Sequence, residues 1–492
     1  MNFKVLISAI FASIITVAGC SDDTNSAGGG AGGGGGTATG VCDTGFGGFP
    51  AADCNNLPDL SGYAVGDFYD VPPTSDDCPG GTFEGAPMNA SALNVLLSNA
   101  NIGDIICIAE GTYAMEATVN VSIPGVTLKG IGDSPDDTVL NFGGPGTGKG
   151  ILVQQDNVTI ENMWVKNTGD NGVQQEEVTG SVFRKLHVSW DINGENMTLN
   201  GGYAVYPTFC QDTLIEYCQL QGASDAGIYV GKCGWDNEET KGGIVRYNLV
   251  HENVLGLEVE NSLDVVLHDN TMVNNTAGLL TIAQPGAWGD GNTPSNTNVI
   301  WYDNDSYCNN HPNFAAGGVP AIAPSGTGAL VYSGDGQELC NNRFQNNVTA
   351  GILIISNYFI CQVAPPTDCN VPDGYIPYAQ NVYTHDNYFD GNGTDPQGQF
   401  AIVFQLLGIG TPENPVEDIF WDGYVSPDAP NGDPGICLGA DNTASYRDVT
   451  QDQCQDVDCT GLTEELCQLE IISCGVMNTT TETTGRLCDA PL

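Results

Sequence analysis

The sequence has 492 residues, with 60 Asp and Glu against 12 Lys and Arg, which gives a formal net charge of -48 at pH 7. Nucleic acids and anionic lipid surfaces require cationic patches, so this charge argues strongly against both as direct partners and suits divalent cations or a salty medium instead. The 65 glycines suit a turn-rich β protein, because glycine tolerates left-handed backbone at small cost.

Residues 1–19 have the parts of a secretion signal: Lys4, an apolar run over 5–17 that is too short to span a bilayer, and small residues before Cys20. The ending Val-Ala-Gly-Cys resembles the lipobox of bacterial lipoproteins, which implies a lipidated Cys20 followed by a flexible Gly-rich tether over 20–41. An ordinary cleaved signal with a chance cysteine is the alternative. We expect a protein of the bacterial cell envelope, at the outer membrane or surface, that meets the membrane only through this anchor. The lipid anchor would be contradicted if palmitate failed to label the protein in a Cys20-dependent way.

Residues 42–87 contain three cysteines and many Gly, Pro and Asp residues, which predicts an irregular N-terminal extension. A short helix is predicted over 89–100, where it would close the open end of a repeat fold. Its apolar residues, which we expect to be buried, are Leu93, Val95, Leu96 and Leu97.

Internal repetition is clearest over residues 213–262. Alternating apolar runs at 215–220 and 245–250 are each followed by a polar turn and a glycine-led run, Gly227-Ile-Tyr-Val or Gly256-Leu-Glu-Val. Short alternating runs between turns are typical of strands, and stacked equivalent strands form a parallel β-solenoid. We therefore predict an all-β fold, a single-stranded parallel β-helix over residues 88–425.

Successive coils can be counted from their first inward apolar residue, and the shortest spacings, 22 and 23 residues, define the bare coil. These residues are Ile160, Phe183, Ile215, Val245, Leu267, Trp301, Leu339 and Thr384. Longer spacings indicate inserted loops, such as 284–298 and 308–336. In the glycine-led strands alternation directs one set of side chains inward and the other outward, as a ladder along the outside. The inward set is Val173, Ile228, Val230, Leu257, Val259, Leu279, Ile352 and Ile354, and the outward set is Gln174, Tyr229, Glu258, Glu260, Leu280 and Leu353.

Four segments carry a family resemblance: GTYAMEATVNVSIPGVTLKGIG, GASDAGIYVG at 222–231, GLEVENS at 256–262 and NNHPNFA at 309–315. They resemble the parallel β-helix repeat proteins of bacterial envelopes, within the pectin-lyase-like group. The resemblance covers about residues 85–425 and implies a right-handed helix. It implies no particular reaction, because fold does not fix function, and the catalytic motifs of polygalacturonases, pectate lyases and alginate epimerases are absent.

One polar constellation on the outward ladder is a candidate site. Asp225 lies in the turn before one glycine-led strand, and Glu258 and Glu260 lie on the equivalent strand of the next coil. Paired carboxylates can act as acid and base on a sugar or can bind Ca²⁺, so these three are candidate catalytic residues and calcium ligands. Tyr206, Tyr229 and Lys232 are candidate substrate-binding residues. The competing interpretation is solvated surface and turn chemistry.

Other recurring polar residues favour structural roles. Outward charges that alternate from coil to coil predict strand-stabilising ion pairs, at Glu161, Arg184, Glu216, Arg246 and His268. Recurring asparagines predict stacked turn residues, at Asn248, Asn270, Asn304, Asn342 and Asn387. Histidines 187, 251, 311 and 385 fall at scattered register positions, so the sequence predicts no histidine metal site.

The 18 cysteines indicate an oxidising compartment and disulfides, since paired C-x-x-C motifs of metal fingers are absent. Cys107, inside an apolar run, is the predicted buried free thiol. Cys308 with Cys340 and Cys361 with Cys369 are the predicted loop disulfides. Six cysteines from Cys437 to Cys488 predict that residues 426–492 form a disulfide-stapled appendage, with 15 possible pairings.

Two functions are compatible with these patterns. The first is binding or processing of an extended, uronate-type polysaccharide, with Ca²⁺ bridging the acids of the protein and the polymer; as an enzyme it would be a lyase, an epimerase or a glycoside hydrolase. The second is a non-enzymatic adhesive scaffold that presents the loops 284–298 and 308–336. The sequence does not decide whether the protein is an enzyme.

Overall fold

The computed structural model describes residues 54, 65–72, 78, 83–86, 89–192, 196–235, 241–285, 295–363, 375–439, 444–449 and 480–481. All of them belong to the second of two units, residues 39–492. The signal segment, Cys20, the tether and most of the C-terminal cysteines lie outside the described residues, so the predictions made for them stay predictions. No helix in the described ranges combines the length and the apolar composition needed to cross a bilayer.

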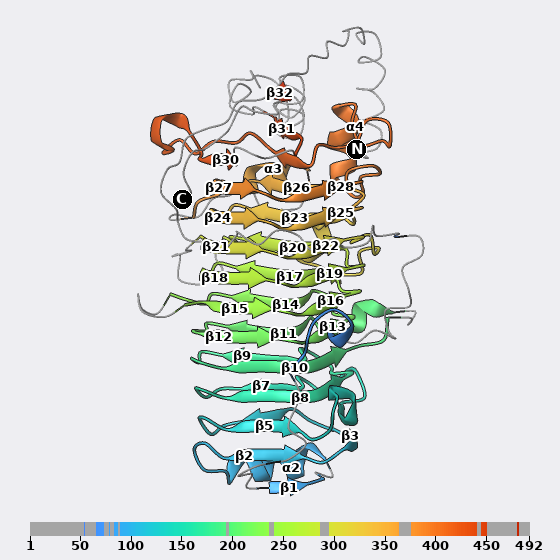
Figure 1. The fold of residues 1–492 in the computed structure, drawn as a ribbon, viewed down its shortest axis with the longest axis vertical. Coiled ribbons are helices and arrows are strands. Elements are labelled where there is room, and N and C mark those ends of the chain that lie inside the picture. The colour runs from blue at the N-terminus through green and yellow to red at the C-terminus, as the bar shows by residue number, and fades with distance from the viewer. Residues whose placement is uncertain are drawn as a thin grey trace. The chain divides into compact units, whose positions relative to one another are not determined.

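The described chain forms stacked coils whose strands pair in parallel with their equivalents in the coils before and after (Figure 1). The strands lie on three faces, which we call A1, A2 and B. Strands β8 and β10 are long and contribute to both A1 and A2.

Face A1 carries the run that opens each coil. Its strands are β1 (Phe83–Gly85), β2 (Ile105–Ile108), β5 (Thr127–Gly130), β8 (Thr159–Lys166), β10 (Val182–Ser189), β12 (Thr213–Glu216), β15 (Gly243–Arg246), β18 (Leu263–His268), β21 (Thr297–Tyr302), β24 (Asp335–Cys340), β27 (Gln380–His385) and β30 (Ile436–Leu438).

Face A2 follows after a short turn and, besides parts of β8 and β10, contains β3 (Gly111–Ala114), β6 (Thr138–Asn141), β13 (Gln219–Gln221), β16 (Leu249–His251), β19 (Thr271–Val273), β22 (Asp305–Tyr307), β25 (Arg343–Gln345) and β28 (Tyr388–Asp390).

Face B is the glycine-led face. Its parallel strands are β4 (Val119–Val121), β7 (Ile151–Val153), β9 (Val173–Glu176), β11 (Tyr203–Thr208), β14 (Ala226–Gly231), β17 (Leu255–Glu260), β20 (Ala277–Ile282), β23 (Thr327–Tyr332), β26 (Ala350–Ile355), β29 (Ile419–Trp421) and β31 (Tyr446–Asp448). A last strand, β32 (Thr480–Thr481), pairs with β31 in the antiparallel sense.

Helices are short in the described part of the chain. They are α2 (Ala90–Ser98), α3 (Asn357–Val363) and α4 (Phe400–Leu406), with 3₁₀ turns at η3 (Val65–Asp67), η4 (Pro135–Asp137), η5 (Met197–Leu199), η6 (Pro320–Ile322) and η7 (Pro430–Gly432).

The predicted coil count is confirmed. Each predicted opening residue stands opposite the next in the strand register, from Ile160 with Phe183 to Leu339 with Thr384, and all are buried. The predicted inward residues of face B belong to the same core, for example Ile228 and Leu257. Alternation sets these faces because successive side chains of a strand point to opposite sides.

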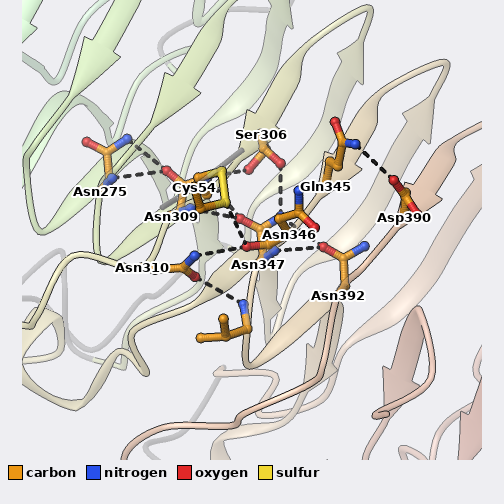
Figure 2. Close-up of a disulfide and its surroundings, with 12 residues drawn as sticks. Cys54, Asn275, Ser306, Asn309, Asn310, Gln345, Asn346, Asn347, Asp390 and Asn392 are labelled. Atoms are coloured by element: carbon orange, nitrogen blue, oxygen red, sulfur yellow. Dashed lines mark hydrogen bonds between the residues drawn. A yellow bond between two sulfur atoms is a disulfide. The ribbon is translucent and has the colours of Figure 1, made fainter. Parts of the chain in front are cut away.

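Asparagine ladders run along two turns of the stack. The predicted ladder is confirmed: the side-chain nitrogen of Asn248 donates to Asn270 Oδ1 at 2.9 Å, and equivalent bonds continue to Asn387. A second ladder, not predicted, follows five residues later at Asn253, Asn275, Asn309, Asn347 and Asn392, and Figure 2 shows its last four members. Each asparagine amide also forms hydrogen bonds with backbone groups, so the buried polar groups of the turns have hydrogen-bond partners.

The predicted ion-pair ladder on face A1 is confirmed from Glu161 to Arg246, whereas His268 pairs with its neighbour Asp269 at 2.7 Å and lies outside it. Glu216, only 4% exposed in its side chain, accepts Nε of Arg184 at 2.6 Å and Nη2 of Arg246 at 2.7 Å. These bonds join three successive coils.

The predicted helix is α2, capped by the Asn89 side chain, which accepts the Ala92 N–H at 2.9 Å. Leu93 and Leu97 are buried against the first coils, but Val95 is 60% exposed, so that part of the prediction is wrong. Residues four apart share a helix face, whereas a residue two positions away points to the other side.

An N-terminal strap, which we define as Cys54 and residues 65–72, lies on the outer side of face A2. Val65 packs with Leu249 and Val273, and Tyr69 Oη lies 2.8 Å from Thr271 Oγ1. Cys54 forms a disulfide with Cys308, beside the second asparagine ladder in Figure 2.

Two cysteine predictions are wrong. Cys308 pairs with Cys54 and not with Cys340, because Cys308 follows a strand of A2 whereas Cys340 ends a strand of A1. Cys107 is not free but bonds Cys78, since only its neighbours on β2 point into the core. Among the described residues the free cysteine is Cys218, which is buried. Cys210 pairs with Cys233, and the predicted partner Cys369 of Cys361 lies outside the described residues.

The predicted loop and appendage boundaries need correction. Residues 308–336 include β23, a core strand with buried Ala329 and Val331, and β21 begins at Thr297, inside the predicted loop 284–298. The strands β30 and β31 extend the parallel pairing into the range predicted as the appendage. β30 has only three residues and lies among Gly, Pro and Asp residues, which hide so short an alternation.

Candidate functional site

The predicted site residues gather on the outer side of face B. Tyr229 of β14 stands opposite Glu258 of β17, and Gly231 stands opposite Glu260. Asp225 precedes β14, and Lys232 follows it with left-handed backbone (φ 59°). The structure therefore brings the three carboxyls and Lys232 together, as the repeat alignment predicts.

Their environment differs from the prediction. Glu258 is 2% exposed, Glu260 7% and Tyr229 2%, so the interpretation as solvated surface is wrong. A second apolar layer covers the outer side of the later strands of face B, where the outward residues Leu280 and Leu353 are buried. Its covering side chains come from α3, α4 and the segment before β23: Phe359, Ile360, Phe400, Val403, Phe404 and Ile322.

Burial controls the electrostatics of the carboxyl cluster. Desolvation raises the pKa of Asp225 to about 7, with the nearby Glu260 adding to the shift and a hydrogen bond from Tyr203 opposing it. Desolvation, then the charges of Asp225 and Glu260, raise the pKa of Glu258 well above its ordinary value. Oδ1 of Asp225 and Oε2 of Glu258 are buried with no hydrogen-bond partner among the described residues. Protonated carboxyls are therefore favoured here near neutral pH.

Glu260 is the carboxyl with direct partners. The ammonium of Lys232 lies 3.4 Å from its Oε1, and Gln284 Nε2 donates to its Oε2 at 3.3 Å. Burial raises the pKa of Glu260, and Lys232 and the hydroxyl of Tyr229 oppose that shift. Glu260 thus holds the lysine in place.

Three tyrosines form an aromatic group beside the carboxyls. The ring of Tyr206 stacks on that of Tyr203 at 4.5 Å, and Tyr229 packs against both at 4.8 Å. Burial raises the pKa of Tyr206 to about 12, so its phenol keeps its proton. Tyr203 was missed by sequence reasoning, although it is three residues before Tyr206 in the same strand.

Next to this group lies an open polar cavity of about 590 Å³. It includes two predicted residues, Tyr206 and Lys232, and is otherwise lined by Gln154, Gln174, Glu176, Glu177, Thr208 and Phe209. Asp225, Glu258 and Glu260 do not line it. Glu176 is held by Lys149 Nζ at 2.9 Å and by Gln154 Nε2 at 3.2 Å. Hydrogen-bonding amides, a carboxylate and an ammonium around an aromatic ring match the groups that bind sugar hydroxyls and carboxylates.

A cavity of about 610 Å³ lies elsewhere, between residues 310–325 and 395–399, and contains none of the predicted residues. The smaller polar cavity is the stronger candidate because it coincides with the residues that the repeat alignment singles out.

The carboxyl cluster does not form a compact metal cage. Among the described residues, a set of three potential ligand side chains with ligand atoms within 4.8 Å of one another occurs at Glu338, Cys340 and His385, and not at Asp225, Glu258 and Glu260. Cys340 is in a disulfide, so its sulfur is not available as a thiolate. Ca²⁺ needs its oxygen ligands gathered about 2.3–2.6 Å from one point, and the three carboxyls are not gathered in this way here.

Solved structures similar to this chain share only the fold with it. The A-module of mannuronan C-5 epimerase AlgE4 from Azotobacter vinelandii is 13% identical, with 77% of this chain and 93% of that chain covered and a TM-score of 0.47. The catalytic unit of the GH87 alpha-1,3-glucanase from Streptomyces thermodiastaticus is also 13% identical, with 78% and 53% covered and a TM-score of 0.40. At these values the likeness carries no information on the reaction of this chain.

No curated protein matches the sequence. Residues 125–298 match the family model described as "Right handed beta helix region". These residues form the coils from β5 to the start of β21, and together with the parallel register on all three faces they confirm the fold prediction. The chain is a right-handed parallel β-helix protein.

Proposed function

We propose that this protein binds and processes an extended, uronate-type polysaccharide at the polar cavity on face B. The observation that carries the proposal is the cavity itself, about 590 Å³ of polar space in which Tyr206 and Lys232 meet Gln174 and Glu176. The protein has only 12 Lys and Arg residues, so an ammonium group in an open cavity would favour an anionic sugar over a neutral one.

The side chains support distinct roles. Lys232 would pair with the carboxylate of a uronate unit, while Glu260 fixes the position of its ammonium. The phenol of Tyr206 would donate a hydrogen bond to a sugar oxygen, because its raised pKa keeps it protonated. Glu176 and Glu177 are the carboxylates that line the cavity. Asp225 and Glu258, which were predicted as catalytic, do not line the cavity. As buried carboxyls with raised pKa values, they would exclude water from the site and add little negative charge to it.

Replacing Lys232 with methionine tests this assignment. The variant keeps the length of the side chain and removes its charge, and charge-assisted hydrogen bonds contribute about 1.5–3 kcal/mol, so we expect binding of a uronate oligosaccharide to weaken about 10- to 100-fold. Calorimetric titration measures the affinity, and product analysis on polyuronate and neutral glucan panels measures processing. Lys241→Met is the matched control, because Lys241 pairs with Asp264 on face A1, outside the cavity. Absence of both binding and turnover on every polymer would favour the adhesive scaffold.

We further propose that Ca²⁺ bridges the acids of the polymer and those of the cavity, Glu176 and Glu177. Chelation of calcium should therefore weaken binding of a polyuronate at least about tenfold, because uncompensated like charges repel. Binding to a neutral glucan is the control and should not change. Added CaCl₂ should restore the affinity, whereas unchanged polyuronate binding in chelator would exclude a calcium bridge.

A further inference from the structure

A second polar cluster lies on the outer side of face A2, away from the cavity. His187 of β10 stands opposite Gln219 of β13, and His251 of β16 lies one strand further and two residues along, opposite Gln221. All three side chains point outward, because their neighbours Val188, Leu220 and Val250 belong to the core. The two imidazoles are therefore diagonal to each other, with the amide of Gln219 between them.

His187 presents an unshared electron pair in this cluster. Its Nδ1 lies 2.8 Å from Asp136 Oδ1, and an ionised carboxylate only accepts hydrogen bonds, so Nδ1 carries the proton. Nε2 is then the basic nitrogen. It is buried and has no partner among the described residues, an arrangement that costs free energy unless something binds there.

His251 repeats the arrangement. Its Nδ1 lies 3.0 Å from Glu252 Oε2, and the same carboxylate oxygen accepts Gln221 Nε2 at 2.9 Å. Nε2 of His251 is therefore also the basic nitrogen, and it faces the amide of Gln219 at 3.3 Å.

The cluster is enclosed and rigid. His251 is fully buried and Gln219 is 7% exposed. The ring of Trp164 stacks on His187 at 4.3 Å and is itself fixed by a 2.8 Å hydrogen bond to Ser189 Oγ. Asp136, whose side chain is 58% exposed, marks the side from which solvent reaches His187.

We propose that His187 and His251 bind one divalent transition-metal ion of the zinc class through their Nε2 atoms, with the side-chain oxygen of Gln219 as a third ligand. Imidazole nitrogen is a preferred ligand of such ions, and metal-binding histidines usually donate their other N–H to a carboxylate, as both do here. Rotation of the Gln219 amide exchanges its nitrogen for its oxygen without moving the chain.

The sequence predicts no histidine metal site, because the histidines differ in register, and this proposal departs from that prediction. Strands two coils apart are separated by about 9.6 Å, and Gln219 lies on the strand between the two histidines, 3.3 Å from Nε2 of His251.

Zinc titration of the chelator-treated full-length protein tests the proposal. We expect one tight site in the native protein, which His187→Ala and His251→Leu each abolish. Asp136→Asn should weaken it about 10- to 100-fold, because the carboxylate orients the imidazole. His311→Ala and His385→Ala are matched controls, since these histidines lie on other elements, and both should bind zinc as the native protein does.

Cobalt provides a readout that needs no variant. Co²⁺ bound at this site should give visible absorption bands of nitrogen and oxygen ligation, without the thiolate charge-transfer band that a cysteine site would produce. Circular dichroism checks that each variant folds. Absence of zinc binding, zinc binding that survives loss of both histidines, or loss of binding in the His385 variant would each overturn the proposal.

Discussion

Replacing Cys54 and Cys308 together with alanine should lower the free energy of unfolding by about 5 kcal/mol. The two cysteines are 254 residues apart, and a cross-link over so long a loop removes much conformational entropy from the unfolded chain. The disulfide also holds the strap on Leu249 and Val273, so its loss would expose apolar surface of face A2. Denaturant titration of both proteins under oxidising conditions measures the difference.

The disulfide between Cys210 and Cys233 supplies the comparison. It closes a loop of only 23 residues, and the same entropy argument predicts a cost of about 3 kcal/mol for its replacement by alanines. If the two double-alanine variants lost the same unfolding free energy, loop length would not determine the stabilisation by each disulfide. Local packing around the disulfides would then determine it.

Raising the pH from about 4.5 to 7 should destabilise the protein through its buried carboxyls. Folding raises the pKa of Asp225 to about 7 and raises those of Glu258 and Glu260, whereas unfolded carboxyls titrate near 4. Between these values the folded state holds protons that the unfolded state has released, so stability falls as pH rises, by about 1.4 kcal/mol per pH unit for each such proton. Below this window both states are protonated, and above it both are ionised.

The variant with Asp225→Asn, Glu258→Gln and Glu260→Gln should show a much flatter profile of unfolding free energy against pH. Some slope should remain, because burial also raises the pKa of Asp422 to about 7 and that of Asp305 to about 6. Neutralising two exposed acids, Glu413 and Asp428, is the control and should leave the slope unchanged. An unaltered slope in the triple variant would mean that the cluster is hydrated and ionised.

Much of the fold could be predicted because its determinants are local. The inward and outward sides of the strands follow directly from the alternation around Ile215 and Val245 and from the glycines before Ile228 and Leu257. The contacts that escaped prediction are between distant residues. Nothing near Cys308 indicates that its partner is Cys54, and the short strand around Ile436 has too few residues to show a period.

The candidate site was predictable in its place but not in its environment. Alternation puts Tyr229, Glu258 and Glu260 on the outer side of face B, and they do lie there. Their burial depends on residues of other coils, such as Tyr203, whose ring packs on Tyr229, and Leu280, which stands opposite Glu258. Glu176 escaped notice because it ends its strand, and nothing in its own segment shows that Lys149 and Gln154 gather around it.

The asparagine ladders make the protein tolerant of insertions. Consecutive members of the first ladder, from Asn248 to Asn387, are 22, 34, 38 and 45 residues apart, yet every step makes the same amide bond. Doubling the length of a flexible loop costs only about 0.6 kcal/mol in closure entropy. New segments can therefore enter between coils while the register of the stack stays fixed, which makes this chain a suitable carrier for grafted peptides.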